Sequence, residues 1–523
     1  VELQFLHGLA DPIRRAAVAQ GYRVREYVPV GEMIPGMAYL VRRLLESTAQ
    51  QSFLQRLFSR EQDVEQLLAP PVATQAPPAD ARAAEDQGAE DRGADRRSGE
   101  AAVEAESVAA RQTGPVRFQN EPHADFSDPA VRAEMQQALA TIRGSLGRDY
   151  HLVIAGASVA TQVTSLSHNP ARPDEIVGRV ARATIEHADQ ALSAAQAAFP
   201  SWRDTPPRQR ATILLKAAAL MREQRFELAA LEVVEAGKPW READADVTEA
   251  IDFLEYYARE MLRLYRAKDL SDIPGEVDLY FYEPRGVAVV IAPWNFPLAI
   301  PTGMVSAALV AGNTVVFKPA NPTPVIGYAL VRILHEAGVP GGALNFLPGP
   351  GSQIGDHLVG DPRVDLIAFT GSLQVGQSIM QKAVVVAPGQ RNIKRVIAEL
   401  GGKNAIIIDT DADLDAAVDG VLVSAFGYAG QKCSACSRVI VMDEVYDQFV
   451  HRLTQAAASL TIGDPADPGT RLGPVITEEA RTRIMEYVEK GKAEATLAYP
   501  TADMGSIPAL TVATDPAPAV ETS

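Results

Sequence analysis

Cysteine is scarce in this sequence: among 523 residues there are two, Cys433 and Cys436. Two thiols cannot form a disulfide framework, which favours a reducing compartment. The sequence also lacks a run of about 18 apolar residues, the length that a membrane-spanning helix needs. Its opening, VELQFLHGLADPIRRAAVAQ, lacks the basic and apolar regions of a signal peptide. We therefore expect a cytoplasmic protein with no membrane span.

A basic excess is missing as well, because 66 acidic residues outnumber the 49 lysines and arginines and give a formal net charge of −17. An acidic surface argues against nucleic acid or an anionic membrane as a partner. Hydrophobic residues make up 47% of the chain and charged residues 22%, the balance of a globular protein. A chain of this length predicts two or three domains.

Aromatic residues are absent from about residue 61 to residue 114. This stretch consists mainly of Ala, Pro, Asp, Glu, Arg and Gly, and it cannot bury enough apolar surface to offset its ordering entropy. We predict a disordered linker, with a solvated helix over residues 100–111 as the alternative. Before it, YRVREYVPVG alternates like a strand and AYLVRRLLESTAQQSFLQRLF has helical spacing. These elements are too few to bury a core alone.

Two kinds of pattern follow the linker. Long helical patterns come first, such as QRATILLKAAALMREQRFELAALEVVEAG. From Val287 onward, short β-branched runs alternate with helical segments: GVAVVIAPW, TVVFKP, ALNFLPG, VDLIAFTGS and AIIID. Strands that alternate with helices predict crossover units and a mostly parallel sheet.

The two cysteines form a C-x-x-C pair in GYAGQKCSACSR, and three interpretations compete. A structural zinc site needs about four Cys or His ligands, and no second pair lies near, so no metal site is predicted. A redox pair usually opens a helix near the front of its domain, whereas this pair comes late and after a helical segment. A single nucleophile fits better; the alternative is two small buried residues.

Two polar residues are candidates to assist a cysteine nucleophile. Glu399 in ELGGKN could activate a hydrolytic water, because an acyl-enzyme needs a base; the alternative is a turn residue. Asn295 lies in IAPWNFP, where prolines fix the backbone after a strand. Its amide could donate to a developing oxyanion; the alternative is a cap of the helix AIPTGMVSAALVAG.

Two further segments of the sequence weakly indicate a nucleotide-binding site. GNTVVFKPA predicts a strand with Lys318 exposed at its carboxyl end, where α/β sheets bind ligands. IAFTGSLQVG predicts a strand, then Gly371 and Ser372, then a helix start at which a pyrophosphate could dock. Neither this segment nor GPGSQIG has the G-x-G-x-x-G spacing.

The motifs PWNFP, FKPANPTP, FTGSLQVG, ELGGKN and GQKCSA occur in this order and together resemble the aldehyde dehydrogenase superfamily along about residues 115–490. Within it, GQKCSACSR and EADADVTEAIDFLEYYAREM look like the L-glutamate γ-semialdehyde (Δ1-pyrroline-5-carboxylate) dehydrogenases. GYRVREYVPVGEMIPGMAYLVRRLLE resembles the end of a proline dehydrogenase barrel. The pairing implies a bifunctional enzyme of proline catabolism that uses NAD here, with FAD confined to a full-length barrel.

The resemblance assigns roles by position. Cys433 matches the nucleophile, Glu399 the general base, and Asn295 with the Cys433 backbone N–H the oxyanion hole, whereas Cys436 is expected to be packing. Glutamate semialdehyde is the implied substrate and a homo-oligomer the implied assembly of the full-length enzyme. Matches to cofactor contacts are Pro293, Trp294, Lys318, Gly371, Ser372 and Val375, and matches to the proline carboxylate pair are Arg42 and Arg43.

The implied fold class is α/β: a Rossmann-type parallel-sheet domain and an incomplete catalytic α/β domain, preceded by the tail of a (β/α)8 barrel. The expected segments are 1–59 (barrel tail), 60–114 (linker), 115–399 (NAD-binding domain), 400–499 (partial catalytic domain) and 500–523 (irregular tail).

The sequence also departs from the family pattern. The later E-x-F-G-P motif, the substrate-anchoring loop, the oligomerisation strand and most of the barrel are missing. We therefore expect an internal piece of a longer enzyme, with weak or no turnover alone. The alternatives are an aldehyde dehydrogenase for another aldehyde and an inactive nucleotide-binding fragment.

Overall fold

The chain divides into two units, Val1–Glu104 and Ala105–Ser523, and each is described by itself. The predicted linker, the predicted tail after residue 499, and both Arg42 and Arg43 lie outside the described residues. The computed structural model describes residues 2–6, 11–20, 23–27, 118–266, 268–269 and 279–499.

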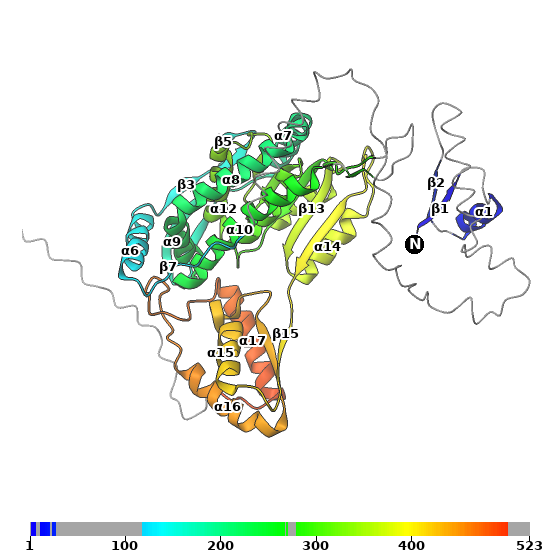
Figure 1. The fold of residues 1–523 in the computed structure, drawn as a ribbon. Helices are drawn as coiled ribbons and strands as arrows, with labels where there is room; N and C mark the ends of the chain where they lie inside the picture. Colours follow the sequence, from blue (N-terminus) through cyan, green and yellow to red (C-terminus); the bar gives the residue numbers. More distant parts are fainter. Residues whose placement is uncertain are drawn as a thin grey trace, which may run out of the picture. The chain divides into compact units, whose positions relative to one another are not determined.

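The described residues of the first unit form a parallel strand pair. Strand β1 (Glu2–Leu6) pairs with β2 (Arg23–Tyr27), and helix α1 (Asp11–Ala19) connects them (Figure 1). The strand predicted within YRVREYVPVG is thereby confirmed. A strand, a helix and a parallel strand form the crossover unit from which (β/α)8 barrels are built.

A seven-stranded sheet forms the centre of the second unit, in the order β14-β13-β10-β11-β12-β4-β5. The first five strands run parallel, while the short β4 and β5 are antiparallel, so the predicted mostly parallel sheet is confirmed. The strands are β4 (Leu152–Ile154), β5 (Ala157–Val159), β10 (Val287–Ile291), β11 (Thr314–Lys318), β12 (Leu344–Phe346), β13 (Val364–Gly371) and β14 (Arg395–Leu400).

Helices cover both faces of this sheet. Ala288 and Val290 of β10 belong to one hydrophobic core, whereas Val287 and Val289 belong to the other, as the alternation of side chains along a strand requires. The first core is covered by α8 (Pro207–Glu223), α9 (Arg225–Ala236), α10 (Trp240–Leu264), α11 (Ala299–Val310) and α12 (Pro324–Ala337). The second is covered by α7 (Ile185–Asp204), α13 (Asp356–Gly360) and α14 (Leu373–Ala383).

Smaller elements flank the sheet. Helix α6 (Pro129–Arg143) packs near α9, and the turn η2 (Gly351–Gly355) leads into α13. A three-stranded sheet consists of β3 (Arg148–Tyr150), β6 (Thr164–Asn169) and β7 (Arg172–Ala181), and a two-stranded one of β8 (Lys268–Asp269) and β9 (Leu279–Tyr280).

The chain after β14 builds a third, smaller core. Strands β15 and β16 pair in parallel, and Ile408, Val421 and Phe449 are buried between them and their helices (Figure 1). The elements are β15 (Asn404–Ile408), α15 (Leu414–Phe426), η3 (Gly427–Gly430), β16 (Cys436–Val441), α16 (Asp443–Ala458) and α17 (Glu478–Glu494).

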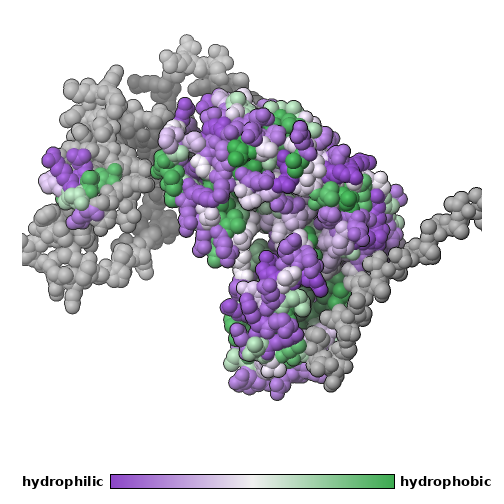
Figure 2. Space-filling view, turned by 180° about the vertical axis from the view of Figure 1, so that it is seen from behind, coloured by the Kyte–Doolittle hydropathy of each residue, from purple (hydrophilic) through white to green (hydrophobic). Residues whose placement is uncertain are grey.

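Hydrophilic residues cover most of the visible surface, with hydrophobic side chains in small separate patches (Figure 2). None of the helices in the described ranges is long and apolar enough to cross a membrane.

A buried carboxylate joins α9 to the start of α12. Glu235 has no exposed surface and accepts hydrogen bonds from Ser167 Oγ at 2.7 Å and from the N–H groups of Val325 and Ile326 at 2.8 Å each. These donors oppose the effect of burial, yet burial raises the pKa of Glu235 to about 7.

This pKa makes stability depend on pH. Between pH 5 and pH 7.5, Glu235 loses its proton more readily in the unfolded chain than in the folded chain. The contribution of Glu235 to the free energy of unfolding therefore falls by about 2 kcal/mol as the pH rises. We expect the difference in unfolding free energy between the natural chain and Glu235→Gln to shrink by that amount, measured by urea unfolding at both pH values. A difference that is independent of pH would contradict the assignment.

Candidate active site

Four neighbouring parallel strands end at one edge of the sheet, and several predicted residues lie on or just after these strand ends. Ile291 of β10 pairs with Lys318, the last residue of β11, and Gly371 of β13 pairs with Leu400 of β14. Because parallel strands end at one edge of a sheet, the segments that follow them meet there. At this edge lie Pro293, Trp294 and Asn295 after β10, Lys318, Gly371 followed by Ser372, and Glu399 one residue before the end of β14.

A cavity of about 450 Å³ opens at this edge. Two of the predicted cofactor residues, Lys318 and Val375, line it, and Pro293 and Trp294 follow Ile291, which lines it as well. Its remaining walls come from η2 and α13 (Gly351, Ser352, Gly355, Asp356 and Val359) and from α14 (Gln374, Ser378 and Ile379). A concave site of this size is typical of small-molecule and cofactor binding.

Helix α14 points its amino terminus at the cavity edge. Ser372 is its N-cap, and the Ser372 hydroxyl accepts a hydrogen bond from Val375 N at 3.4 Å. A Cβ on Gly371 would lie 2.6 Å from Phe369 Cζ, and one on Gly376 would lie 2.6 Å from Leu400 Cδ2. Gly376 therefore lets the helix pack closely on the sheet, and Gly371 leaves room for the Phe369 ring. Its unpaired N–H groups and positive dipole end suit an anion.

Lys318 differs from the sequence prediction in one respect, because its side chain is buried rather than exposed, with 5% of its surface accessible. Strand β11 is covered on both faces, so its last residue reaches the cavity from inside the sheet. Nζ donates to Pro319 O at 3.0 Å, and burial lowers the pKa of Lys318 to about 8. The ammonium group is therefore largely charged at neutral pH and points at the space where a ligand would lie.

Asn295 lies half-buried in the loop between β10 and α11. It does not cap α11, because N-cap Leu298 has no side-chain cap and Asp246 Oδ1 accepts from Ala299 N at 2.7 Å instead. Within the described part of the chain, no group hydrogen-bonds the Asn295 side chain. Its amide N–H groups are thus free to donate to a substrate oxygen, as the oxyanion-hole interpretation requires.

Cys433 follows a turn with unusual backbone angles. Tyr428 and Ala429 have φ values of 51° and 55°, in the left-handed region that residues with a side chain rarely adopt. The Tyr428 hydroxyl donates to Ala236 O at 2.7 Å, and Ile476 N donates to Gln431 Oε1 at 3.0 Å, so both ends of the turn are tied to other elements. The Cys433 residue is exposed. A strained, anchored turn that presents an accessible thiol is typical of a functional site.

The second cysteine has a different environment. Cys436 is buried at the start of β16, and its Sγ donates to Arg438 O at 3.1 Å. Its backbone N–H donates to Ser424 Oγ at 3.2 Å. These contacts agree with the expected packing role.

The segment that follows Glu399 reaches the Cys433 turn. A Cβ on Gly402 would lie 2.9 Å from Cys433 O, and the Asn404 side chain donates to the same oxygen at 2.9 Å. Glu399 is exposed and lies three residues before Gly402. The segment that follows the strand of the predicted base therefore contacts the backbone of the predicted nucleophile.

Sequence reasoning overlooked the residues that tie these loops together. Lys238 lies between α9 and α10, fully buried, with Nζ 4.6 Å from the centre of the Phe296 ring and 5.4 Å from that of Tyr428. Its signal in the sequence is slight: a lysine between Gly237, which ends α9 in the left-handed region, and a proline.

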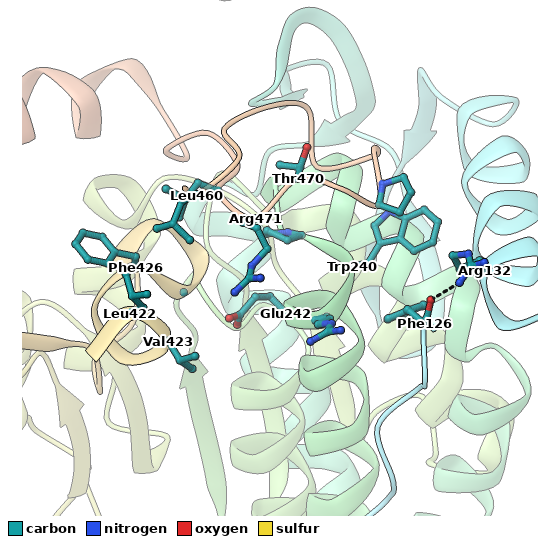
Figure 3. A pocket seen from close by; sticks show the side chains of 15 residues that line it. Phe126, Arg132, Trp240, Glu242, Leu422, Val423, Phe426, Leu460, Thr470 and Arg471 are labelled. Atoms are coloured by element: carbon teal, nitrogen blue, oxygen red, sulfur yellow. Dashed lines mark hydrogen bonds between the residues drawn. The ribbon is translucent and has the colours of Figure 1, made fainter. Parts of the chain in front are cut away.

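A second pocket, of about 390 Å³, lies where the start of α10 faces α15 and the loop after α16 (Figure 3). Glu242 and Arg471 line it, and Glu242 pairs with Lys432, the neighbour of Cys433, at 2.7 Å. Of the predicted catalytic residues, none is among the described residues that line this pocket. Lys318 and Val375, two of the predicted cofactor residues, line the cavity at the sheet edge instead.

Comparison with known proteins gives two family matches. Residues 159–518 match the aldehyde dehydrogenase family, and residues 1–56 match proline dehydrogenase. The chain is 50% identical over 380 residues to the 1-pyrroline-5-carboxylate dehydrogenase of Geobacillus sp. (strain WCH70), which covers 73% of this chain and 74% of that protein. The corresponding enzyme of Geobacillus kaustophilus (strain HTA426) is 51% identical over the same shares.

Solved structures agree with these matches. Proline utilization A (PutA) from Bdellovibrio bacteriovorus aligns with a TM-score of 0.73 and 45% identity, over 95% of this chain and 49% of that one. The chain thus spans about half the length of that protein. The 1-pyrroline-5-carboxylate dehydrogenase from Thermus with bound NAD aligns with a TM-score of 0.71 and 47% identity, over 73% of this chain and 74% of that one. The chain belongs to the aldehyde dehydrogenase family.

Proposed function

We propose that this chain carries the site for NAD-dependent oxidation of L-glutamate γ-semialdehyde, the open form of 1-pyrroline-5-carboxylate, to L-glutamate. Relatives about half identical over 380 residues are named for this reaction. The structural observation that supports the proposal is the hydrogen bond from Asn404 Nδ2 to the Cys433 carbonyl, because Asn404 lies five residues after Glu399.

The residues at the sheet edge fit a dinucleotide. A cavity of about 450 Å³ combines one buried ammonium group, Lys318, with the amino terminus of α14. Lys318 would contact the adenosine ribose, Gly371 and Ser372 the pyrophosphate, and Pro293, Trp294 and Val375 would complete the contacts. Bound NAD supplies the acceptor for the hydride that leaves the substrate carbon.

Cys433 and Asn295 would carry out the first half of the reaction. The Cys433 thiolate attacks the aldehyde carbon, and a C–S bond forms as the carbonyl oxygen takes the negative charge. The Asn295 amide and the Cys433 backbone N–H stabilise this oxyanion by hydrogen bonds. Loss of the hydride from the same carbon leaves a thioester on Cys433.

Glu399 would carry out the second half. Its carboxylate accepts a proton from a water molecule, and the water oxygen attacks the thioester carbon. The C–S bond then breaks, the product leaves as a carboxylate, and the thiol is regenerated. Glu399 is exposed, which suits a base that must reach water.

The first unit supports a wider proposal, that this chain comes from a protein that also oxidises proline. Residues 1–56 match proline dehydrogenase, and PutA aligns over 95% of this chain. The roles of Arg42 and Arg43 toward the proline carboxylate, the homo-oligomer and the cytoplasmic location stay predictions. FAD is not expected in the short barrel segment.

Replacement of the two cysteines separates their roles. We expect Cys433→Ser to lose iodoacetamide labelling at residue 433 and to lower any turnover of the semialdehyde by roughly 10³-fold or more. Cys436→Ser, the matched control, should keep both, because Cys436 is buried away from the reagent. Mass spectrometry of the labelled peptide and NADH absorbance provide the measurements. Full turnover in Cys433→Ser would contradict the proposal.

Replacement of Glu399 by Gln should separate the two half-reactions. The thioester still forms, but its hydrolysis slows by roughly 10²–10⁴-fold because no base activates water. We expect a burst of NADH close to one per site, followed by a slow steady rate, in rapid-mixing absorbance. The absence of a burst, together with equal slowing of both phases, would assign Glu399 to a different step.

A further inference from the structure

A fully buried cation lies between the loop that carries Asn295 and the turn that precedes Cys433. Lys238 Nζ lies 3.1 Å from Glu232 Oε2 of α9 and also forms an ion pair with Asp246 of α10. The side chains of Lys238, Glu232 and Asp246 are each at most 1% exposed. The three residues are called here the charge cluster.

The charge cluster carries one cation in an apolar interior. Burial alone would lower the pKa of Lys238, but the charges of Asp246 and Glu232 raise it above its ordinary value, so the ammonium stays charged. Burial and the neighbouring Asp246 raise the pKa of Glu232 well above its usual range. The charge cluster therefore consists of a charged Lys238 ammonium group between two buried carboxyl groups. A buried cation of this kind needs well-placed partners on every side.

Those partners come from both catalytic segments. The Phe296 ring, next to Asn295 in the chain, lies 4.6 Å from Nζ, and the Tyr428 ring, five residues before Cys433, lies 5.4 Å from it. Aromatic faces at these distances attract a cation, and more strongly where water is excluded. The cluster also fixes the far end of the Asn295 loop, because Asp246 Oδ1 accepts from Ala299 N at 2.7 Å.

We propose that Lys238 is a positioning residue for the reaction: through Phe296 and Tyr428 it sets the place of Asn295 relative to Cys433, an inference that rests on the roles proposed above for those two residues. Among the described residues, Lys238 is the one cation that lies over both the Phe296 ring and the Tyr428 ring. Tyr428 is in addition held by its hydroxyl on Ala236 O, so the cation lies beside a turn whose backbone is already constrained. A nucleophile and an oxyanion donor must be held to within about half an ångström to act on one carbonyl.

The double variant Lys238→Met/Asp246→Asn tests this proposal. Removal of Lys238 alone would leave a buried carboxylate without its cation and risk unfolding. The double variant removes one positive and one negative charge, and the amide oxygen introduced at position 246 can still accept from Ala299 N. Two controls accompany it: Asp246→Asn, which keeps Lys238 beside the Glu232 carboxyl group, and Glu235→Gln, which alters another buried carboxyl group on α9.

Hydrogen–deuterium exchange of the full chain gives the first measurement. We expect amides in residues 294–300 and 427–433 to exchange roughly tenfold or more faster in the double variant than in the natural chain, because both segments lose their shared anchor. Both controls should match the natural chain there. Unchanged exchange in either segment of the double variant, or equal acceleration in Asp246→Asn, would overturn the proposal.

Steady-state kinetics give the second measurement. A positioning role predicts that kcat falls roughly 10–100-fold in the double variant, while the Kd for NAD changes less than twofold because the cofactor cavity lies elsewhere. A fall in kcat accompanied by an equal loss of affinity for NAD would indicate general unfolding and would also overturn the proposal. Failure of the proposed function shows separately, as turnover that survives Cys433→Ser, and the exchange result then still decides whether Lys238 anchors the two segments.

Discussion

The carboxyl edge of the parallel sheet is the constraint on which the site depends. Strands β10, β11, β13 and β14 are hydrogen-bonded neighbours, so the residues that end them lie next to one another along one edge of the sheet. Lys318 and Glu399 are themselves residues of these strands, so their positions at the edge do not depend on a loop. Strand pairing thereby fixes the predicted cofactor contact and the predicted base on one rigid frame, and helix α14 adds its amino terminus to the same edge.

The predicted nucleophile does not belong to this sheet. Cys433 belongs to the smaller core after β14, and its place depends on contacts from other segments: Gly402 and Asn404 against its carbonyl, and Tyr428 on Ala236. A turn with two non-glycine residues in the left-handed region costs of order 1–3 kcal/mol for each such residue. Hydrogen bonds of Tyr428 and Gln431 to other elements help to hold the turn in this conformation. Rigid positioning of one exposed thiol is the property that this arrangement provides.

Local pattern in the sequence predicted much of this structure. Runs such as VAVVI and TVVFK predicted buried parallel strands because nearly every residue in them is apolar or β-branched, and both are covered on two faces. The motif order led to the family, which the comparisons confirm. The antiparallel β4 and β5 were not predicted, since three-residue strands carry too little pattern to be recognised.

Long-range contacts set the limit of sequence reasoning. Asn295 precedes α11, and asparagine is a common N-cap residue. Asp246, more than forty positions earlier in the chain, nevertheless accepts the hydrogen bond from Ala299 N at the start of this helix. Lys318 was expected to be exposed because lysine usually is, but its strand lies inside the sheet. Lys238 gave no usable signal, because its partners Glu232, Asp246, Phe296 and Tyr428 come together only when four segments have folded.

The central claim is that one carbonyl group can contact the thiol, the amide and the carboxylate predicted for this site. A crystal structure of the chain with NAD and a stable aldehyde analogue tests it most directly. The account predicts Cys433 Sγ bonded to the analogue carbon, with Asn295 Nδ2 roughly 3 Å from its oxygen and Glu399 within reach of the carbon through one water. An analogue bound in the 390 Å³ pocket beside Glu242 and Arg471, away from Cys433, would contradict it.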